Sequence, residues 1–277
     1  MTTTKPILFH APPSYYSMIA RLVLAEKNVA FESHLIDIHL QQQQHSAFYA
    51  NINPNLSVPS LEISKEKILI ASDEILYYVE AHYPGACLTA ENKQLMNQFI
   101  DDLYAIPIEQ LTMGHTFTRH PKMLARGLGV LDKATNKCRK LASQYPELQE
   151  IFEKKVETNE KRRQSFNAAN IEHTYLQAKE LTEKMLNNMN HQLQTSSYLA
   201  GEKYSLADVV ATVFLARIFF INEQNMISQH KELEAYFKKL SARASFKQAD
   251  IWQQFQTTYP LKLIAKFFKA KMLGKTA

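Results

Sequence analysis

The feature that most restricts the fold of this 277-residue chain is a single change of hydrophobic pattern near residue 84. Before that point, short segments with strand-like alternation take turns with segments whose apolar residues recur at helical spacing. From residue 88 onward every segment is helical in pattern. We therefore predict an α+β protein, with a mixed domain at 1–84, an all-α domain at 88–258 and a separate tail at 259–277.

The first 84 residues are predicted to fold in the order β-α-β-α-β-β-α. Strands are expected at 6–11, 30–38, 58–64 and 67–72, and helices at 15–29, 41–52 and 72–84. The last of these helices is expected to have Ser72 as its N-cap and to end before Pro84. Glycine is scarce, with 6 residues in the whole chain, which argues against an all-β architecture with its many tight turns.

The helical part of the chain contains one segment that is much more apolar than the others, "SLADVVATVFLARIFFI" at 205–221. A helix that is apolar on every side is expected to be buried, so this segment is predicted to form the centre of a second core. Ser205 is expected to cap the helix, with Asp208 three residues later reaching back to the N–H of Ser205. This motif serves folding rather than catalysis.

Cysteine usage and the N-terminal sequence both favour a reduced, cytoplasmic location. Cys87 and Cys138 are too few for a disulfide framework, and neither stands in a metal-ligand spacing. The opening "MTTTKPILFH" lacks the charged and then apolar pattern of a signal peptide. The sequence contains no stretch of about 18 uninterrupted apolar residues that would predict a membrane span.

The positive charge of the chain is concentrated in the tail at 259–277. This segment carries five lysines and no acidic residue, and five is also the formal net charge of the whole chain. The rest of the chain is therefore formally neutral, which argues against nucleic acid as a partner. As a helix, the tail has lysines on one face and apolar residues on the other. It suits peripheral contact with an anionic membrane, or docking on the helical domain with its lysines in water.

Pro59 lies within "NPNLSVPSLEI", a run that otherwise has the composition of a buried strand. Proline has no N–H to donate, so it is not expected inside a central strand. Two interpretations follow from the residues alone. Pro59 is either a proline at the entry to a strand, or it also reshapes the chain before the strand through a cis peptide bond, which is accessible at X–Pro bonds.

Three segments in the predicted order resemble motifs of the glutathione transferase superfamily. They are "PILFHAPPSYYSMIARLVLAEKNVAFE", "NPNLSVPSLEI" and "YLAGEKYSLADVVA". The resemblance implies a thioredoxin-like N-terminal domain, an all-α C-terminal domain, and a cis bond before Pro59. In such proteins the backbone of the residue before this proline pairs with glutathione, which implicates Ser57, Val58 and Pro59 in binding it.

The middle of the chain is similar to a particular branch of that superfamily. Compared with ordinary members, an extra helical region of about 115–170 is inserted, and with "HTFTRHPKM" and "KCRKLASQYPELQEIFEKKVE" it resembles the ganglioside-induced differentiation-associated protein branch. Most superfamily members form dimers, so a homodimer is expected, although the insertion could cover or replace the usual dimer surface.

The turn "PPSYYS" holds the candidate catalytic residues. Members of the superfamily place a hydroxyl donor near the sulfur of glutathione at a helix N-terminus, where it favours the nucleophilic thiolate. Ser14 aligns with the serine of zeta-like members by its offset from Arg21, and Tyr15 is the alternative donor. A purely structural role for Ser14, as the cap of the first helix, is also open.

The γ-glutamyl end of glutathione is normally held by a Glu-Ser pair at the start of a helix. The matching pair here is Ala71-Ser72, so the acid that would meet the ammonium of the ligand is missing. Ser72 and nearby N–H groups can still bind the carboxylate, with Asp73 as a substitute acid. No metal site is expected, because His115 and His120 are five residues apart and lie on different faces of a helix.

Two functional hypotheses follow from the resemblance. The first is a glutathione transferase that uses the thiolate of its co-substrate glutathione on a small electrophile, by conjugation, dehalogenation or isomerisation. The second is a catalytically inactive scaffold of the same fold that binds a membrane surface or a protein partner. Ser14, Val58, Pro59 and Ser72 favour the enzyme, whereas Ala71 and the insertion favour the scaffold.

Overall fold

A four-stranded sheet forms the centre of the N-terminal part of the chain. The computed structural model describes residues 5–254. The strands are β1 (Ile7–His10), β2 (Glu32–Leu35), β3 (Ser60–Ser64) and β4 (Lys67–Leu69), in the spatial order β2-β1-β3-β4. β2 is parallel to β1, while β3 is antiparallel to both β1 and β4. The predicted order of elements and the thioredoxin-like arrangement are confirmed.

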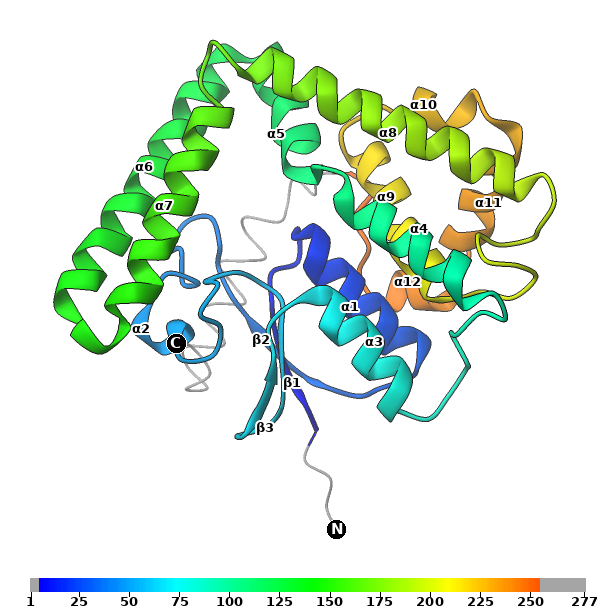
Figure 1. Ribbon diagram of the computed structural model, residues 1–277, viewed down its shortest axis with the longest axis horizontal. Coiled ribbons are helices and arrows are strands. Elements are labelled where there is room, and N and C mark those ends of the chain that lie inside the picture. The colour runs from blue at the N-terminus through cyan, green and yellow to red at the C-terminus, as the bar shows by residue number, and fades with distance from the viewer. Residues whose placement is uncertain (1–4, 255–277) are drawn as a thin grey trace.

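Helices cover both faces of this sheet (Figure 1). α1 (Tyr15–Glu26) and α3 (Ser72–His82) pack together on one face, which also turns toward the helical domain. α2 (Ala47–Ala50) covers the other face, where its Tyr49 belongs to a small cluster with Phe9 of β1. The sheet is therefore buried on both sides.

The predicted helix at 41–52 is wrong in length, because only Ala47–Ala50 are helical. The carboxylate of Asp37 accepts the backbone N–H groups of the three residues 39–41 and so folds the preceding segment into a turn. Gln42 then has a positive φ of 51°, which a helix does not accommodate. A local side chain thus competes successfully with helix formation in this segment.

The rest of the described chain is helical. The helices are α4 (Lys93–Ala105), α5 (Ile108–Arg119), α6 (Pro121–Gln144), a 3₁₀ turn (Pro146–Leu148), α7 (Gln149–Ser165), α8 (Ile171–Leu193), α9 (Leu206–Phe220), α10 (Asn225–Ser228), α11 (Lys231–Ser241) and α12 (Ala244–Gln248). α9 lies at the centre of this group and packs against both α1 and α4. Its predicted burial at the centre of the helices is confirmed, but the core that it belongs to is shared with α1 and α3 and is not a separate second core.

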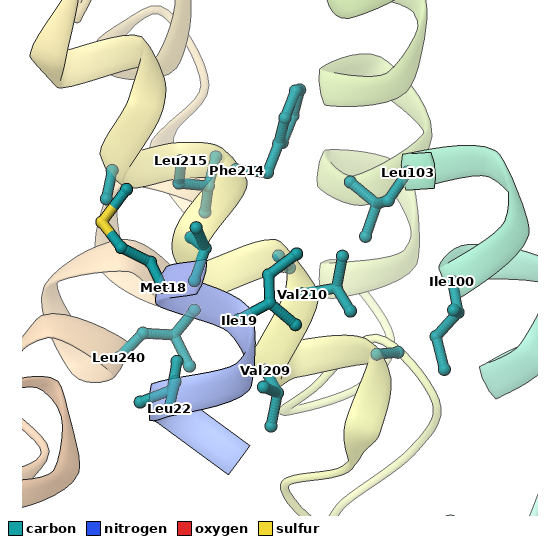
Figure 2. Close-up of a cluster of buried hydrophobic side chains, with 14 of the residues drawn as sticks. Met18, Ile19, Leu22, Ile100, Leu103, Val209, Val210, Phe214, Leu215 and Leu240 are labelled. Carbon is teal, nitrogen blue, oxygen red and sulfur yellow. The ribbon is translucent and has the colours of Figure 1, made fainter. Parts of the chain in front are cut away.

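One continuous hydrophobic core joins the two parts of the chain (Figure 2). Met18 and Ile19 of α1 are fully buried beside Val210 and Phe214 of α9. Leu103 of α4 closes the cluster from the other side. Because α1 belongs to the N-terminal part of the chain and α9 to the helical domain, this core fixes the two parts relative to each other.

The start of α9 is fixed by the predicted capping box, which is confirmed. Asp208 is fully buried and accepts four hydrogen bonds. They come from Ser205 N at 2.7 Å, Ser205 Oγ at 2.8 Å, Leu199 N at 3.0 Å and Tyr236 Oη at 2.5 Å. One carboxylate therefore joins the helix start, the loop before it and α11.

The segment predicted to be an insertion, about 115–170, contains a hairpin of two long helices, α6 and α7, that pack along each other beside α2 (Figure 1). Its inner face forms a small apolar cluster with the chain around α2: Ala50, Leu56, Cys138, Ala142, Leu148 and Phe152. Two lysines add polar contacts to the same segment. Lys137 Nζ donates to the carbonyls of Gln41 at 3.0 Å and Gln42 at 2.8 Å, and Lys155 Nζ donates to that of Asn55 at 3.1 Å.

The docking of this α6–α7 hairpin predicts an unusual dependence of stability on pH. Burial beside the cation of Arg162 lowers the pKa of Lys155 to about 8. In the unfolded chain a lysine keeps its proton to about pH 10.4. Between these values the unfolded state binds more protons, so the free energy of unfolding should rise with pH, by on the order of 1–3 kcal/mol.

Denaturant unfolding at pH 7, 8, 9 and 10 measures this effect when the wild type is compared with Lys155→Met. Other groups titrate in the same range, but they do so in both proteins. The difference between the two curves should therefore change steadily from about pH 8 upward. Parallel curves across this range would contradict the assignment of a destabilised ammonium at Lys155.

The basic tail at 259–277 lies outside the described residues, and both interpretations of it stay predictions. Within residues 5–254, no helix is long and apolar enough to cross a membrane.

Candidate functional site

The predicted site residues meet at one edge of the sheet, where β1 ends and β3 begins. Phe9 of β1 lies opposite Ser60 of β3. Because these strands are antiparallel, the turn at 11–14 that follows β1 must lie beside Val58 and Pro59, which precede β3. The active-site turn and the proline segment are therefore neighbours, although about 45 residues separate them in the sequence.

The peptide bond between Val58 and Pro59 is cis, as predicted. Val58 is half-buried, and within residues 5–254 neither its N–H nor its C=O has a hydrogen-bond partner. The carbonyl of Ser57, in contrast, accepts from Tyr49 Oη at 2.8 Å and from Asn53 Nδ2 at 2.9 Å. Ser57 thus holds the turn in place, while Val58 offers a free donor and a free acceptor to an extended ligand.

Asn53 connects this turn to the second predicted subsite. Its side chain is fully buried, and Nδ2 also donates to Ser60 Oγ at 2.9 Å and to the carbonyl of Ile70 at 3.1 Å. Ile70 directly precedes Ala71 and Ser72. The side-chain amide of Asn53 therefore holds the proline turn and the start of α3 together. Asn53 is part of the motif "NPNLSVPSLEI", but the sequence alone did not indicate this role.

The start of α3 differs by one residue from the prediction. Ala71, not Ser72, is the N-cap, and Ala71 has no side chain that could cap the helix. Ser72 is the first helical residue, and its Oγ lies 2.9 Å from Tyr104 Oη of α4. The N–H groups of the first turn have no intrahelical partners and favour an anion. Asp73 is exposed in this turn.

Ser14 is the N-cap of α1, where its Oγ accepts the N–H of Ser17 at 3.3 Å. The expected capping role is therefore present. A hydroxyl group has one proton to donate as well as lone pairs to accept. The cap uses only a lone pair, so the Oγ–H of this half-buried serine can still donate to a ligand at the helix N-terminus.

Tyr15 points into the protein instead. Its side chain is buried, and its hydroxyl has no hydrogen-bond partner within the described residues. Burial, reinforced by the neighbouring Tyr16 and Tyr104, holds the pKa of Tyr15 well above 10, while Arg217 opposes this shift. The phenol therefore stays protonated. Between the two candidate donors, the geometry favours Ser14.

A row of aromatic rings connects the two helix starts. The rings of Tyr15 and Tyr16 are 5.1 Å apart in an edge-on contact, and Tyr16 stacks on Tyr104 at 6.0 Å. Tyr104 in turn contacts Ser72. Burial raises the pKa of Tyr104 as well, so its hydroxyl also stays protonated. Nothing in the sequence around Tyr104 indicated that α4 would contribute to this site.

Arg217 of α9 lies beside Tyr15, at the opposite end of the aromatic row from Tyr104. It was not identified as a site residue from the sequence. Its Nη2 donates to the carbonyl of Pro13 at 2.9 Å, and its guanidinium lies 5.9 Å from the ring centre of Tyr15. Burial lowers the pKa of Arg217 to about 10, with Tyr15 opposing the shift. A signal was available, because Arg217 is the only basic residue in the most apolar helix of the chain.

The side chain of Arg21 holds the turn at 11–14 in place through hydrogen bonds to its backbone. The Nη2 of Arg21 donates to the carbonyls of Pro12 and Asp250, both at 3.0 Å, its Nη1 to that of Ala11 at 3.4 Å and its Nε to that of Ala249 at 2.7 Å. The turn that presents Ser14 is thereby tied to the C-terminal end of the described residues. No group of three metal-ligating side chains occurs within residues 5–254.

Comparison with protein families matches both parts of this architecture. The sequence model of the glutathione S-transferase N-terminal domain matches residues 8–87, and that of the C-terminal domain matches residues 147–244. A solved relative by fold is glutathione transferase F7 from Populus trichocarpa, with a TM-score of 0.64 and 18% identity. That comparison covers 88% of this chain and 97% of the poplar chain, and it supports the fold.

Two curated relatives cover most of the chain. The tetrachloro-p-hydroquinone reductive dehalogenase of Sphingobium chlorophenolicum is 26% identical, over 88% of this chain and 95% of the relative. The human ganglioside-induced differentiation-associated protein 1-like 1 is 24% identical, over 87% of this chain and 72% of the relative. The two domain models together match well over half of the sequence, and the chain therefore belongs to the glutathione S-transferase superfamily.

Proposed function

We propose that this protein is an enzyme that uses the thiolate of glutathione to attack a small electrophile. The observation that carries the proposal is the position of Ser14. Its hydroxyl stands at the N-terminus of α1, at the same sheet edge as the unpaired backbone groups of Val58 and close to the start of α3. This is a site for an extended anionic peptide with a nucleophilic sulfur.

Each subsite has a role in the proposed complex. The N–H and C=O of Val58 pair with the cysteinyl backbone of glutathione, and Ser57 and Pro59 fix the shape of that turn. The γ-glutamyl carboxylate lies on the first-turn N–H groups of α3 and on Ser72. Asp73, exposed in the same turn, faces the ammonium group of the ligand.

The chemistry follows from stabilising a thiolate. The Oγ–H of Ser14 donates to the sulfur, and the positive end of the α1 dipole favours its negative charge, so the pKa of the bound thiol falls. The thiolate then forms a bond to an electrophilic carbon. With a halogenated substrate, the carbon–halogen bond breaks and halide leaves with the electron pair. The dehalogenase relative supports halogenated compounds as one substrate class.

The alternative is a scaffold without catalytic activity. Ala71 in place of an acid and the α6–α7 hairpin favour it, as does the basic tail, which suits a membrane surface. For both alternatives we propose a cytoplasmic homodimer, divided into a glutathione-binding domain at 1–84, a helical domain at 88–258 with its insertion at about 115–170, and a tail at 259–277.

Calorimetric titration of the purified full-length protein with reduced glutathione tests the proposal. We expect a dissociation constant in the millimolar range or tighter, which is sufficient at the concentration of glutathione in cells. Turnover of 1-chloro-2,4-dinitrobenzene, followed by chloride release, then tests catalysis. Absence of binding at 10 mM glutathione would overturn the enzyme proposal and favour the scaffold.

Restoring the missing acid should strengthen binding. In Ala71→Glu, a carboxylate at the N-cap of α3 can pair with the ammonium of the γ-glutamyl group, and a hydrogen bond between charged groups is worth about 1.5–3 kcal/mol. We expect glutathione affinity to increase about tenfold or more. The dipeptide cysteinylglycine lacks the γ-glutamyl group and should gain nothing. An equal gain for both ligands would contradict this placement of the γ-glutamyl end.

A further inference from the structure

Arg217 is a buried cation that forms an ion pair with no aspartate or glutamate side chain of the protein. Only 5% of its surface is exposed, and its Nε is buried without a hydrogen-bond partner. Within residues 5–254 no carboxylate lies within ion-pair distance of it. Residues 1–4 and 255–277 contain no aspartate or glutamate, so every acidic side chain of the protein is included in this statement.

An unpaired buried guanidinium is strongly unfavourable, because the protein replaces only part of the hydration that the charge loses. The other buried cations of this structure have compensation. Lys27 pairs with Glu80 at 2.9 Å, and Arg21 donates to four backbone carbonyls. Within residues 5–254, Arg217 has a single carbonyl, that of Pro13. The described part of the chain therefore leaves the charge of this guanidinium largely uncompensated.

The location of Arg217 indicates which kind of molecule would supply a compensating anion. Pro13 directly precedes Ser14, so the guanidinium lies next to the turn that presents the nucleophile. Its immediate neighbours are aromatic, with the ring of Phe220 at 4.7 Å and that of Tyr15 at 5.9 Å. Arg217 also lies on α9 of the helical domain, whereas Val58 and Ser72, which serve glutathione in the proposed function, lie in the N-terminal part of the chain.

We propose that Arg217 binds an anionic group, a carboxylate or phenolate, on an aromatic electrophile. This inference rests on the proposed function and names the substrate class of the same site. A planar guanidinium matches such oxygen anions, because its N–H donors form a rigid fork that pairs with two oxygens at once. The half-buried ring of Phe220 provides an apolar surface for the substrate ring. The thiolate of glutathione, in contrast, is already served by Ser14 and the start of α1.

A matched pair of electrophiles tests this proposal. 4-Chloro-3,5-dinitrobenzoate carries a carboxylate, whereas 1-chloro-2,4-dinitrobenzene is neutral, and both lose chloride to a thiolate. In Arg217→Met, we expect the ratio of kcat/KM for the anionic over the neutral substrate to fall about tenfold or more, mainly through KM. Arg217→Lys keeps the positive charge but not the forked donors of the guanidinium, so its preference for the anionic substrate should lie between those of the wild type and Arg217→Met. Arg126→Met, at an exposed arginine of α6, should retain the wild-type ratio.

Stability distinguishes this role from a structural one. If Arg217 serves a ligand, Arg217→Met removes an unpaired buried charge, and its melting temperature without ligand should equal or exceed that of the wild type. A large decrease in melting temperature, or an equal loss with both electrophiles, would overturn the proposal. The equal loss would indicate that Arg217 acts on the thiolate.

A binding measurement separates this inference from the proposed catalytic function. 3,5-Dinitrobenzoate has no leaving group, so its binding can be titrated calorimetrically in the absence of turnover. The wild type should bind it at least tenfold more tightly than Arg217→Met, even if the wild type turns over neither electrophile. Equal affinities would overturn the anion site, whatever the enzyme does with glutathione.

Discussion

Replacing Ser14 by alanine is expected to lower kcat/KM for glutathione conjugation by about 10²–10³-fold, the usual effect of removing one preorganised donor to a developing or stabilised anion. The alternative donor, the hydroxyl of Tyr15, does not replace it, because the side chain of Tyr15 is buried and points into the protein. The pH–rate profile should also change. Without the donor, the pKa of the bound thiol rises, and the rising limb of kcat/KM shifts to higher pH.

The same substitution removes a helix cap, so a control for stability is needed. Loss of the cap is expected to lower the free energy of unfolding by about 0.5–2 kcal/mol. Asn92 caps α4, where its side chain accepts the N–H of Leu95 at 3.0 Å. Asn92→Ala should therefore lose similar stability but keep its activity. If Tyr15→Phe abolished activity and Ser14→Ala did not, Tyr15 would be the donor.

Replacing Asp208 by alanine is expected to lower the free energy of unfolding by about 3–5 kcal/mol. Four donor groups on three residues, the N–H and Oγ–H of Ser205, the N–H of Leu199 and the hydroxyl of Tyr236, would lose their common acceptor, and each buried donor left without a partner costs about 1–3 kcal/mol. For a chain of this size the melting temperature should fall by about 10 °C. Chemical denaturation followed by circular dichroism measures both quantities.

Tyr236→Phe provides the matched comparison for this prediction. It removes one of the four hydrogen bonds and leaves the carboxylate with the other three, so a loss of about 1 kcal/mol is expected. A loss in Asp208→Ala no larger than that in Tyr236→Phe would contradict the view that one carboxylate organises the start of α9. Glutathione affinity of the folded fraction should be little changed in either variant.

The features predicted correctly from the sequence are those that depend only on residues close together in the chain. The capping box of α9 needs only Ser205 and Asp208, and the strand β3 needs only the residues after Pro59. The predicted helix at 41–52 failed because the carboxylate of Asp37 folds the chain before α2. The N-cap of α3 was displaced by one residue, from Ser72 to Ala71, which is within the usual uncertainty of helix ends.

Only the site residues that lie in the first domain could be predicted from the sequence. Ser14, Val58 and Ser72 lie in motifs of the first domain, whose spacing the sequence displays directly. Tyr104 contacts Ser72 from α4 and Arg217 contacts Pro13 from α9, and both contacts depend on how the helices of the two parts pack together. Such packing follows from the whole core and not from a local pattern. The sequence could therefore single out Arg217 as an unusual residue of its helix but could not place it, or Tyr104, beside the first domain.

The α6–α7 hairpin has a thermodynamic consequence beyond its packing. Through Lys155 it holds the segment around α2, and Tyr49 and Asn53 of that segment hold the turn that presents Val58. A molecule that binds the hairpin and shifts this contact must therefore change the affinity of the site for its ligand. Linkage is reciprocal, so occupation of the site must change the affinity of the hairpin for that molecule by the same factor.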